Sequence, residues 1–272
     1  MIAVETKMEQ LNTQTVAYHV ELPAVRHGTD KLNERLERFA ARYETILAGG
    51  GAVSVTDNPM GKLAFAGHEL IEELRLPIPA DRVMIHLNTF HTLAGVTEIL
   101  EHCVRLGVRR LLIVSGDGSL RLPKLRPAEL GTDGEAVTSV ELLAWIRRRY
   151  GDFFAMGVAF NQYEPPEHEY DKLWRKLDAG ADFVITQPVV RPTPAIDRLI
   201  QESPVPVLLE AWMSPKIELL SECIGYPVEI AGEFAPVAAL RQLEAHYSTS
   251  TFYLSLLNFK DWDEVNKGRR QG

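Results

Sequence analysis

Polar side chains recur where the short apolar segments of this sequence end. Carboxyl groups, an imidazole, amides and hydroxyls stand at these places, and together they could transfer protons and hold a flat polar ligand. They are Glu21, Thr56-Asp57-Asn58, His86, Asn88-Thr89, Ser115-Gly116-Asp117, Asn161-Gln162, Gln187, Glu210 and Asn258. Any one of them is more simply explained as a cap or a loop anchor. Their convergence on one edge of a sheet would be the stronger sign of a binding site.

Glu21 is the candidate acid, because it interrupts the apolar segment Tyr18-His19-Val20-Glu21-Leu22. Burial disfavours a carboxylate and raises its pKa, as a general acid requires. An ion pair with an arginine or lysine across the rim explains the same residue equally well. His86 could be a base or a ligand, although a buried, hydrogen-bonded histidine is the commoner outcome. The histidines show no accepted metal-ligand spacing, so no metal site is predicted.

Two further patterns suit a negatively charged or flat ligand. Gly116-Asp117-Gly118 is a tight turn whose glycines would let the backbone approach a ligand closely. It is not a dinucleotide fingerprint, and a turn aspartate often has no further role. Arg175 and Lys176 stand in the last turn of an expected helix, where cations normally complement the helix dipole. Contact with an anionic cofactor is the alternative.

Short segments rich in β-branched residues alternate with longer amphipathic ones, which is typical of repeated βα units in an α/β protein. The expected strands are residues 16–22, 52–56, 83–89, 110–115, 154–161, 183–190, 205–212 and 251–258. The expected helices are residues 30–47, 92–106, 137–150, 167–178 and 234–246. Eight such units close a barrel, and 272 residues is the usual length of one. The sequence therefore predicts a single (β/α)8 TIM barrel over about 16–258, followed by a polar tail, 259–272, that is frayed or forms a short helix.

The composition narrows the class of protein. The hydrophobic share of 46% is enough for a large core, and the net charge of −8 argues against a nucleic-acid surface. The apolar runs are too short for a membrane span, and the polar first 14 residues do not resemble a signal peptide. Cys103 and Cys223 are the only cysteines, which fits a reducing compartment. We therefore expect a cytoplasmic protein that binds neither membranes nor nucleic acid.

The same positions carry a resemblance to a known family. Ser54-Val55-Thr56, Gly116-Asp117, the run from Arg175 to Asp182 and the following Ile185-Thr186-Gln187 are similar to segments of the methylenetetrahydrofolate reductase family, in its short bacterial form. The similarity extends over about residues 16–258. The family has a (β/α)8 barrel, so the resemblance implies the fold that the strand count also indicates.

The resemblance implies an oxidoreductase of one-carbon metabolism. Such an enzyme passes hydride from NADH or NADPH, through FAD, to 5,10-methylene-tetrahydrofolate and gives 5-methyl-tetrahydrofolate. By this resemblance Glu21 would protonate the folate nitrogen that leaves, Asp117 would stabilise the iminium cation, and Gln187 would bind the pterin edge. The positions assigned to the cofactor are Thr56, His86, Ser115, Gly116, Asp117, Phe160, Glu169, Arg175 and Lys176.

The sequence departs from the family pattern around the cofactor. Ser115 replaces an arginine beside the flavin, Glu210-Ala211-Trp212-Met213-Ser214 replaces Pro-Gly-Ile-x-Pro, and Cys223 falls near the place of a lid phenylalanine. Two alternatives stay open: a methylene-tetrahydropterin reductase that is flavin-independent or depends on a partner reductase, and a folate-binding or subunit barrel that has lost activity. A homo-oligomer is also compatible with the sequence. A Schiff-base aldolase is disfavoured, because none of the expected strands contains a lysine.

Overall fold

Eight parallel strands form a closed barrel in the computed structural model, which describes residues 16, 18–79, 81–119, 121–230 and 232–267. In chain order the strands are β1 (His19–Leu22), β2 (Ala52–Val55), β3 (Val83–Leu87), β4 (Arg110–Ile113), β5 (Ala155–Phe160), β6 (Phe183–Thr186), β7 (Val207–Trp212) and β8 (Thr251–Ser255). Each strand pairs with its neighbours in sequence, and β8 pairs with β1. The predicted (β/α)8 fold is confirmed. The polar N-terminal residues 1–14 and the end of the tail, 268–272, lie outside the described residues.

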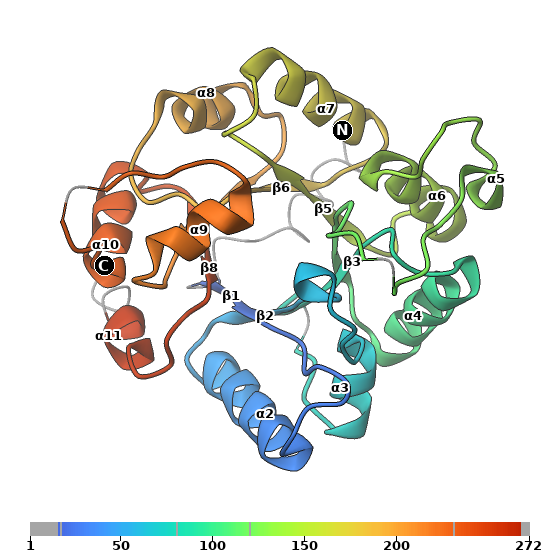
Figure 1. Ribbon diagram of the computed structural model, residues 1–272, viewed down its shortest axis with the longest axis horizontal. Coiled ribbons are helices and arrows are strands. Elements are labelled where there is room, and N and C mark those ends of the chain that lie inside the picture. The colour runs from blue at the N-terminus through green and yellow to red at the C-terminus, as the bar shows by residue number, and fades with distance from the viewer. Residues whose placement is uncertain (1–15, 17, 80, 120, 231, 268–272) are drawn as a thin grey trace, which may run out of the picture.

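A ring of helices surrounds the barrel, which Figure 1 shows nearly end-on. The ring consists of α2 (Leu32–Ala48), α3 (Gly67–Glu73), α4 (Leu93–Leu106), α6 (Ser139–Tyr150), α7 (Pro166–Asp178), α8 (Pro194–Glu202) and α10 (Pro236–His246). Five of these match the expected helices. The sequence did not predict α3 and α8, which are seven and nine residues long and so are shorter than the window over which helical periodicity is read.

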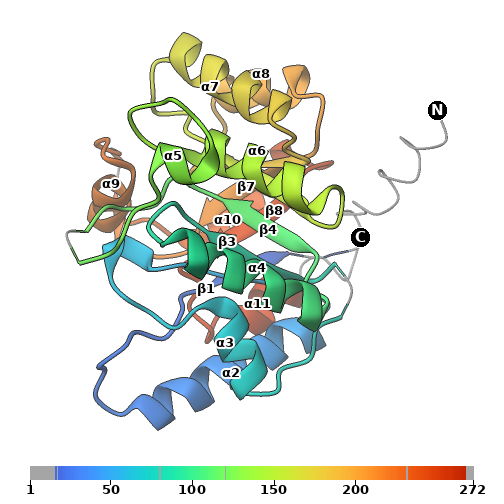
Figure 2. The same ribbon diagram turned by 90° about the vertical axis from the view of Figure 1, so that its right-hand side faces the viewer.

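The remaining helical pieces lie in connections. They are the 3-10 turn η2 (Pro59–Gly61), α5 (Pro127–Leu130), α9 (Ile217–Ile224) and α11 (Trp262–Lys267). Figure 2 shows α9 and the light-blue turn η2 on the same side of the barrel. The short helix expected as one form of the tail is α11, which buries Trp262 and Val265 against the core.

Alternation along the strands separates two cores. Residues such as Val83, Ile85 and Leu87 of β3 pack outward under the helices, in the main hydrophobic cluster. The residues between them point into the barrel, where Met84 meets Phe183 and Tyr253. Strands covered on both faces need apolar residues in nearly every position. A polar residue that points inward is therefore unusual and marks the part of the barrel where ligands could bind.

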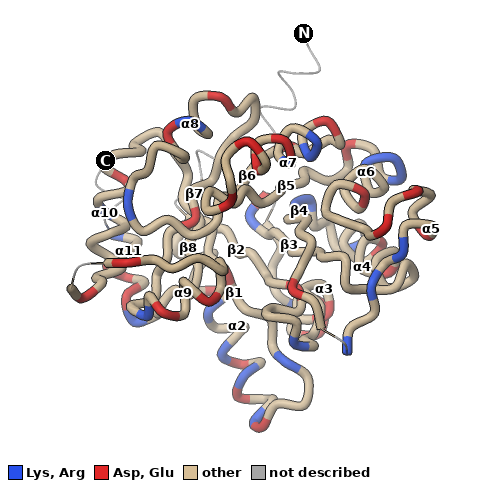
Figure 3. Tube along the Cα trace, turned by 45° about the horizontal axis from the view of Figure 1, so that its top comes forward, with Lys and Arg blue, Asp and Glu red and all other residues tan. Residues whose placement is uncertain are grey.

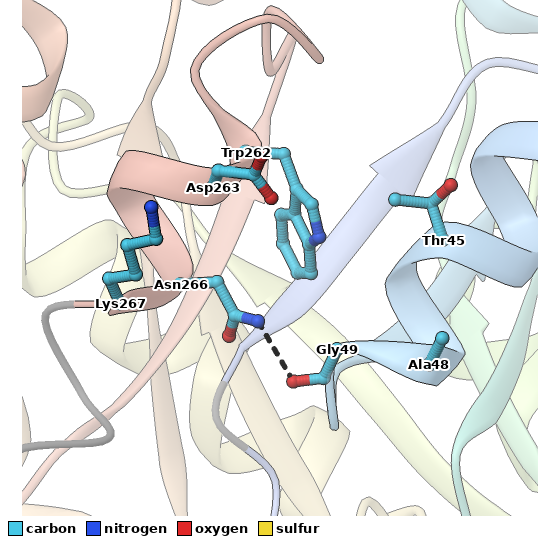
Figure 4. A pocket seen from close by; sticks show the side chains of 7 residues that line it. All are labelled: Thr45, Ala48, Gly49, Trp262, Asp263, Asn266 and Lys267. Carbon is cyan, nitrogen blue, oxygen red and sulfur yellow. Dashed lines mark hydrogen bonds between the residues drawn. The ribbon is translucent and has the colours of Figure 1, made fainter.

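The outer surface carries mixed charge and no membrane-spanning element. Acidic and basic residues alternate around the periphery, for example along α2 (Figure 3). Within the described part of the chain, no helix has the length and apolar character that a membrane crossing requires. A pocket of about 370 Å³ lies between the end of α2 and α11, where Asn266 donates to the carbonyl of Gly49 at 3.1 Å (Figure 4).

Candidate active site

A cavity of about 690 Å³ opens at the C-terminal ends of the strands. This volume is within the range of sites that bind cofactors and small molecules. The cavity wall includes ten of the residues singled out from the sequence, which are Glu21, Thr56, His86, Ser115, Gly116, Asp117, Glu169, Arg175, Lys176 and Gln187. The structure thus gathers residues from six strands or connections at one mouth. A barrel places functional residues at this end.

Glu21 of β1 points into the barrel and borders the cavity. Burial raises the pKa of its carboxyl group to about 7, and a hydrogen bond from Tyr253 partly opposes this rise. The Tyr253 hydroxyl donates to Glu21 Oε2 at 3.2 Å. The ion pair that would be the alternative explanation of Glu21 does not occur with any described arginine or lysine. A carboxyl group with a pKa near neutrality can both give and regain a proton.

His86 of β3 lies beneath Glu21 in a chain of hydrogen bonds. Its Nε2 atom is 3.1 Å from the Tyr253 hydroxyl and 2.9 Å from Ser54 Oγ. Burial lowers the pKa of His86 to about 4, so the imidazole is neutral at neutral pH. Its contacts with protein groups match the buried, hydrogen-bonded histidine that was one of the two interpretations. His86 therefore supports Glu21 through Tyr253.

Asp117 stands at the rim, on the loop that follows β4. Its Oδ2 atom accepts a hydrogen bond from the Met60 backbone at 3.1 Å, which ties this loop to η2. Gly116 has a φ of +79°, in the left-handed region that favours glycine. The carboxyl group of Asp117 is exposed to solvent and borders the same cavity as Glu21.

The thiol of Cys223 on α9 borders the cavity together with Glu21, Glu210 and Asp117. Burial raises its pKa, and the charges of Asp117, Glu21, Glu210 and Glu222 raise it further. Because Glu21 and Asp117 border one cavity, the two acids of the predicted mechanism face a common hollow.

Gln187 follows β6 and borders the cavity. Its backbone is held by the amide of Gln162, which donates to the Gln187 carbonyl at 2.8 Å and accepts from its N–H at 3.1 Å. The side-chain amide of Gln187 makes no hydrogen bond with the described residues. It therefore offers a donor and an acceptor at the wall of the cavity, on a backbone that Gln162 holds in place.

Glu169, Lys172 and Lys176 form a buried ionic cluster on α7. Glu169 is 2% exposed and lies 3.2 Å from Lys172 Nζ and 3.6 Å from Lys176 Nζ. Lys176 also donates to the carbonyl of Ala159 at 2.6 Å, and burial lowers its pKa. Lys176 and Glu169 thus bind each other and the end of β5, although both border the cavity. Arg175 is exposed and forms no ion pair with the described residues, so its charge is available to a ligand.

Thr56 and Phe160 were both assigned to the cofactor, but the Thr56 hydroxyl contacts the protein backbone and Phe160 points away from the cavity. Thr56 uses its hydroxyl to accept from the Ala24 backbone at 3.0 Å, which fixes the turn after β1. Phe160 requires a correction: it is 1% exposed, points outward and packs edge-on against Tyr170 of α7. It is the last residue of β5, and alternation directs it under the helix instead of into the cavity.

Several residues at the cavity received no role from the sequence. They are Arg26, Lys172, Glu210, Trp212 and Cys223, with Thr138, Ser139 and Val140 at the start of α6. Ser54 and Tyr253 lie behind the wall and contact His86 and Glu21. Glu210 was named among the polar strand ends, and its interruption of an apolar strand, as at Glu21, was the signal for a larger role. The first turn of α6 borders the cavity, and its N–H groups are used within the protein: Ser139 N–H donates to Ser115 Oγ at 3.4 Å, and Val140 N–H donates to the hydroxyl of the N-cap Thr138 at 3.2 Å.

Comparison with known proteins agrees with this geometry. The family model described as methylenetetrahydrofolate reductase matches residues 5–193. The chain belongs to the methylenetetrahydrofolate reductase family. The match ends before β7, so Glu210, Cys223 and Tyr253 lie in the part of the barrel where this chain departs from the family model.

Curated members of the family from several eukaryotes are similar to this chain. Methylenetetrahydrofolate reductase 2 of Saccharomyces cerevisiae is 26% identical over 181 residues, which are 64% of this chain and 29% of that protein. Methylenetetrahydrofolate reductase 2 of Schizosaccharomyces pombe is 28% identical over 179 residues, which are 61% of this chain and 26% of that protein. The chain thus spans less than a third of the curated relatives it matches.

A solved structure shares the fold over nearly the whole length. It is an uncharacterized protein from Clostridium thermocellum that binds two copies of 5-methyl-5,6,7,8-tetrahydrofolic acid. The TM-score is 0.59 at 11% sequence identity, and the alignment covers 96% of each chain. At this sequence identity, the likeness shows only that the two proteins share a fold.

Proposed function

We propose that this protein is a methylenetetrahydrofolate reductase-like oxidoreductase, which transfers hydride from NADH or NADPH to 5,10-methylene-tetrahydrofolate and releases 5-methyl-tetrahydrofolate. The observation that carries the proposal is Glu21, a carboxyl group with a pKa of about 7 that borders the same cavity as Asp117 and Gln187. Family membership supplies the reaction class. The neighbour that binds 5-methyl-tetrahydrofolic acid shows that this fold accommodates the proposed product.

Each of the three residues has one task in this reaction. Glu21 gives its proton to the folate nitrogen that leaves when the five-membered ring opens. Asp117, at the rim, places a negative charge where the resulting iminium cation would be stabilised. Gln187 offers a donor and an acceptor to the pterin edge. A properly placed acid of this kind contributes about 100- to 10,000-fold to a rate.

The wall of the cavity fits an anionic cofactor such as FAD. Arg26, Lys172 and Arg175 border it. Of these, Arg175 forms no ion pair with the described residues and would hold the cofactor's phosphates. FAD, when bound, would accept hydride from the nicotinamide and pass it to the folate. Thr56, His86 and Lys176 would support the site from its wall, since Thr56 Oγ1, His86 Nε2 and Lys176 Nζ each contact a protein group.

These internal contacts also favour a second candidate, a reductase that works without a tightly bound flavin. Three of the expected cofactor contacts are satisfied within the protein, which reduces the number of groups left to hold FAD. In this version NADH or NADPH delivers hydride directly to the folate, or a partner reductase supplies the electrons. Glu21, Asp117 and Gln187 keep the same tasks.

The absorbance spectrum of the purified protein tests the proposal. We expect a yellow protein with about one flavin per chain, bleached by anaerobic NADH or NADPH and recoloured by methylene-tetrahydrofolate. A colourless protein that oxidises NADH or NADPH only when methylene-tetrahydrofolate is present would establish the flavin-independent version. If neither reaction occurs with or without a partner reductase, the reductase proposal fails. Calorimetric titration with 5-methyl-tetrahydrofolate would then show whether the barrel is a folate-binding module.

A further inference from the structure

The barrel contains a second inward carboxyl group, Glu210 of β7, which borders the same cavity as Glu21. Only β8 separates the two strands that carry them. In the β7–β8 register Glu210 pairs with Tyr253, and Tyr253 donates to Glu21 Oε2 at 3.2 Å. The Tyr253 side chain therefore lies between the two acids. Neither carboxyl group forms an ion pair with a described residue.

Ionisable groups reach this pair from several elements. They are Tyr253 on β8, His86 on β3, Cys223 on α9, Asp117 on the loop after β4, Tyr163 on the loop after β5, and the cavity-lining Arg26, Asp57, Glu169, Lys172, Arg175 and Lys176. The arginines and lysines are not among the causes that shift the pKa of Glu21 or Glu210. His86 is neutral at neutral pH, so no positive charge compensates two carboxylates.

Two carboxylates that interact in a buried site cannot both ionise easily, and the pair retains a proton. Burial is the largest cause that raises both pKa values, and the charge of Glu21 raises the pKa of Glu210 further. Hydrogen bonds from Tyr253 to Glu21 and from Ser255 to Glu210 each favour the carboxylate form of the acceptor. The charge of Glu21 raises the pKa of Glu210, whereas Glu210 is not among the causes that shift the pKa of Glu21, so Glu210 holds the proton of the pair.

We propose that Glu210 and Glu21 share one proton, and that Glu210 is the proton reserve that supplies it to Glu21 in each turnover. This inference rests on the proposed function. One turnover consumes one hydride and one proton. Glu210 passes the shared proton to Glu21 within the cavity, and Glu21 gives it to the folate nitrogen. Both groups are then carboxylates, and water at the open mouth returns one proton to Glu210.

The test combines a direct titration with a pH profile of turnover. Protein labelled with ¹³C at the glutamate carboxyl carbon is titrated by NMR, with the two signals assigned from Glu21→Gln and Glu210→Gln. We expect the wild-type signals to shift together, in two steps that are separated by more than one pH unit. In Glu210→Gln, Glu21 should titrate in a single step at its own pKa, and the upper step, which belongs to Glu210, should disappear. The alkaline limb of turnover should move down by about one pH unit or more, because the pair no longer retains a proton above the pKa of Glu21.

Glu218→Gln is the matched control, because Glu218 is an exposed glutamate on α9. It should leave both the titration and the pH profile unchanged. Independent titration of Glu21 and Glu210 near their ordinary values in the wild type would overturn the proposal. The NMR arm needs no turnover, so a coupled pair in an inactive protein would support proton sharing and count only against the reductase function. An alkaline limb that stays in place in an active Glu210→Gln variant would refute the reserve role.

Discussion

Tyr253 donates its phenolic hydrogen to Glu21 Oε2 across 3.2 Å, from the strand next to the one that carries the acid. This bond stabilises the carboxylate, whereas burial stabilises the carboxylic acid. The balance leaves the pKa of Glu21 at about 7. The same hydroxyl contacts His86 at 3.1 Å, so one tyrosine connects the candidate acid to the interior of the barrel.

Tyr253→Phe should raise the pKa of Glu21 and move the alkaline limb of turnover to higher pH. The ring still fills the barrel, and only the hydrogen bond that favours the carboxylate is lost. This direction is opposite to the one expected for Glu210→Gln. The measurement is kcat/KM against pH, with Tyr226→Phe as control because Tyr226 is half exposed at the mouth. A limb that moves to lower pH would show that Tyr253 does not stabilise the carboxylate.

Glu21→Gln should make the protein more stable than the wild type at pH 8. The Glu21 carboxyl titrates near 4.5 in the unfolded chain and near 7 in the folded protein. Between these values the folded state binds more protons, so its stability falls as the pH rises. Because water at the cavity relieves part of the burial, we expect a gain of about 2 kcal/mol above pH 7.

Urea denaturation of both proteins between pH 4 and 8 measures this difference. The two curves should converge at low pH, where Glu21 is protonated in both states. Turnover with folate should fall about 100-fold or more in the same variant. A stability difference that does not depend on pH would mean that Glu21 titrates normally in the folded protein.

The barrel itself could be predicted from the sequence, because its strands are nearly continuous apolar runs. Arg110–Ile113 and Phe183–Thr186 are buried at every position, so their largely apolar composition indicates strands that are covered on both faces. The short helix α3 and the eight-residue α9 escaped prediction. Stacking on the barrel stabilises them more than their own periodicity does. Element ends were also placed too late, as at β3, which ends at Leu87 and not at residue 89.

For the candidate site, the sequence could indicate which residue types come together at the cavity. It could not indicate which of their polar atoms remain free of contacts within the protein. Glu21, Asp117 and Gln187 reach one cavity because parallel strands bring their C-terminal ends together. That Lys176 is bound to Glu169 and to the Ala159 carbonyl depends on the packing of α7 against β5, which no local pattern contains. The outward direction of Phe160 depends in the same way on the register of β5.

Lys176→Met and Arg175→Ala should have different effects, although the two residues are adjacent. Removing the Lys176 ammonium leaves the buried Glu169 with Lys172 as its one remaining cation, beside the hydrogen bond from Asn161 N–H, and frees the Ala159 carbonyl. We expect a loss of about 3 kcal/mol in the free energy of unfolding. Arg175→Ala should change stability by less than about 0.5 kcal/mol, because the side chain is exposed and unpaired.

Cofactor binding distinguishes the same two residues. Arg175→Ala should weaken binding of FAD or NADH by about tenfold, which corresponds to one lost contact with a phosphate. Arg38→Ala is the charge-matched control. Arg38 is an exposed arginine of α2 and is not among the residues that line the cavity. Calorimetry with the cofactor measures the effect. Equal affinities in both variants would show that Arg175 does not contact the cofactor.

Gly116→Ala should disrupt the loop that carries Asp117 more than the left-handed backbone conformation of residue 116 would by itself. A Cβ at Gly116 would lie 2.7 Å from the Cβ of Asn88. Asn88 cannot move aside, because its amide nitrogen donates to the Asp57 carbonyl at 3.0 Å and its Oδ1 accepts from Phe90 N at 2.7 Å. The clash should push Asp117 away from its bond with the Met60 backbone.

Gly131→Ala is the matched control for this prediction. Gly131 has a φ of +69°, and a Cβ there meets nothing within 4 Å. The control should therefore lose only the cost of the left-handed conformation, about 1 kcal/mol, and keep its turnover. Gly116→Ala should lose about 3 kcal/mol and most of its turnover with folate. Equal losses in the two variants would mean that the loop tolerates the contact with Asn88, and that the position of Asp117 does not depend on a glycine before it.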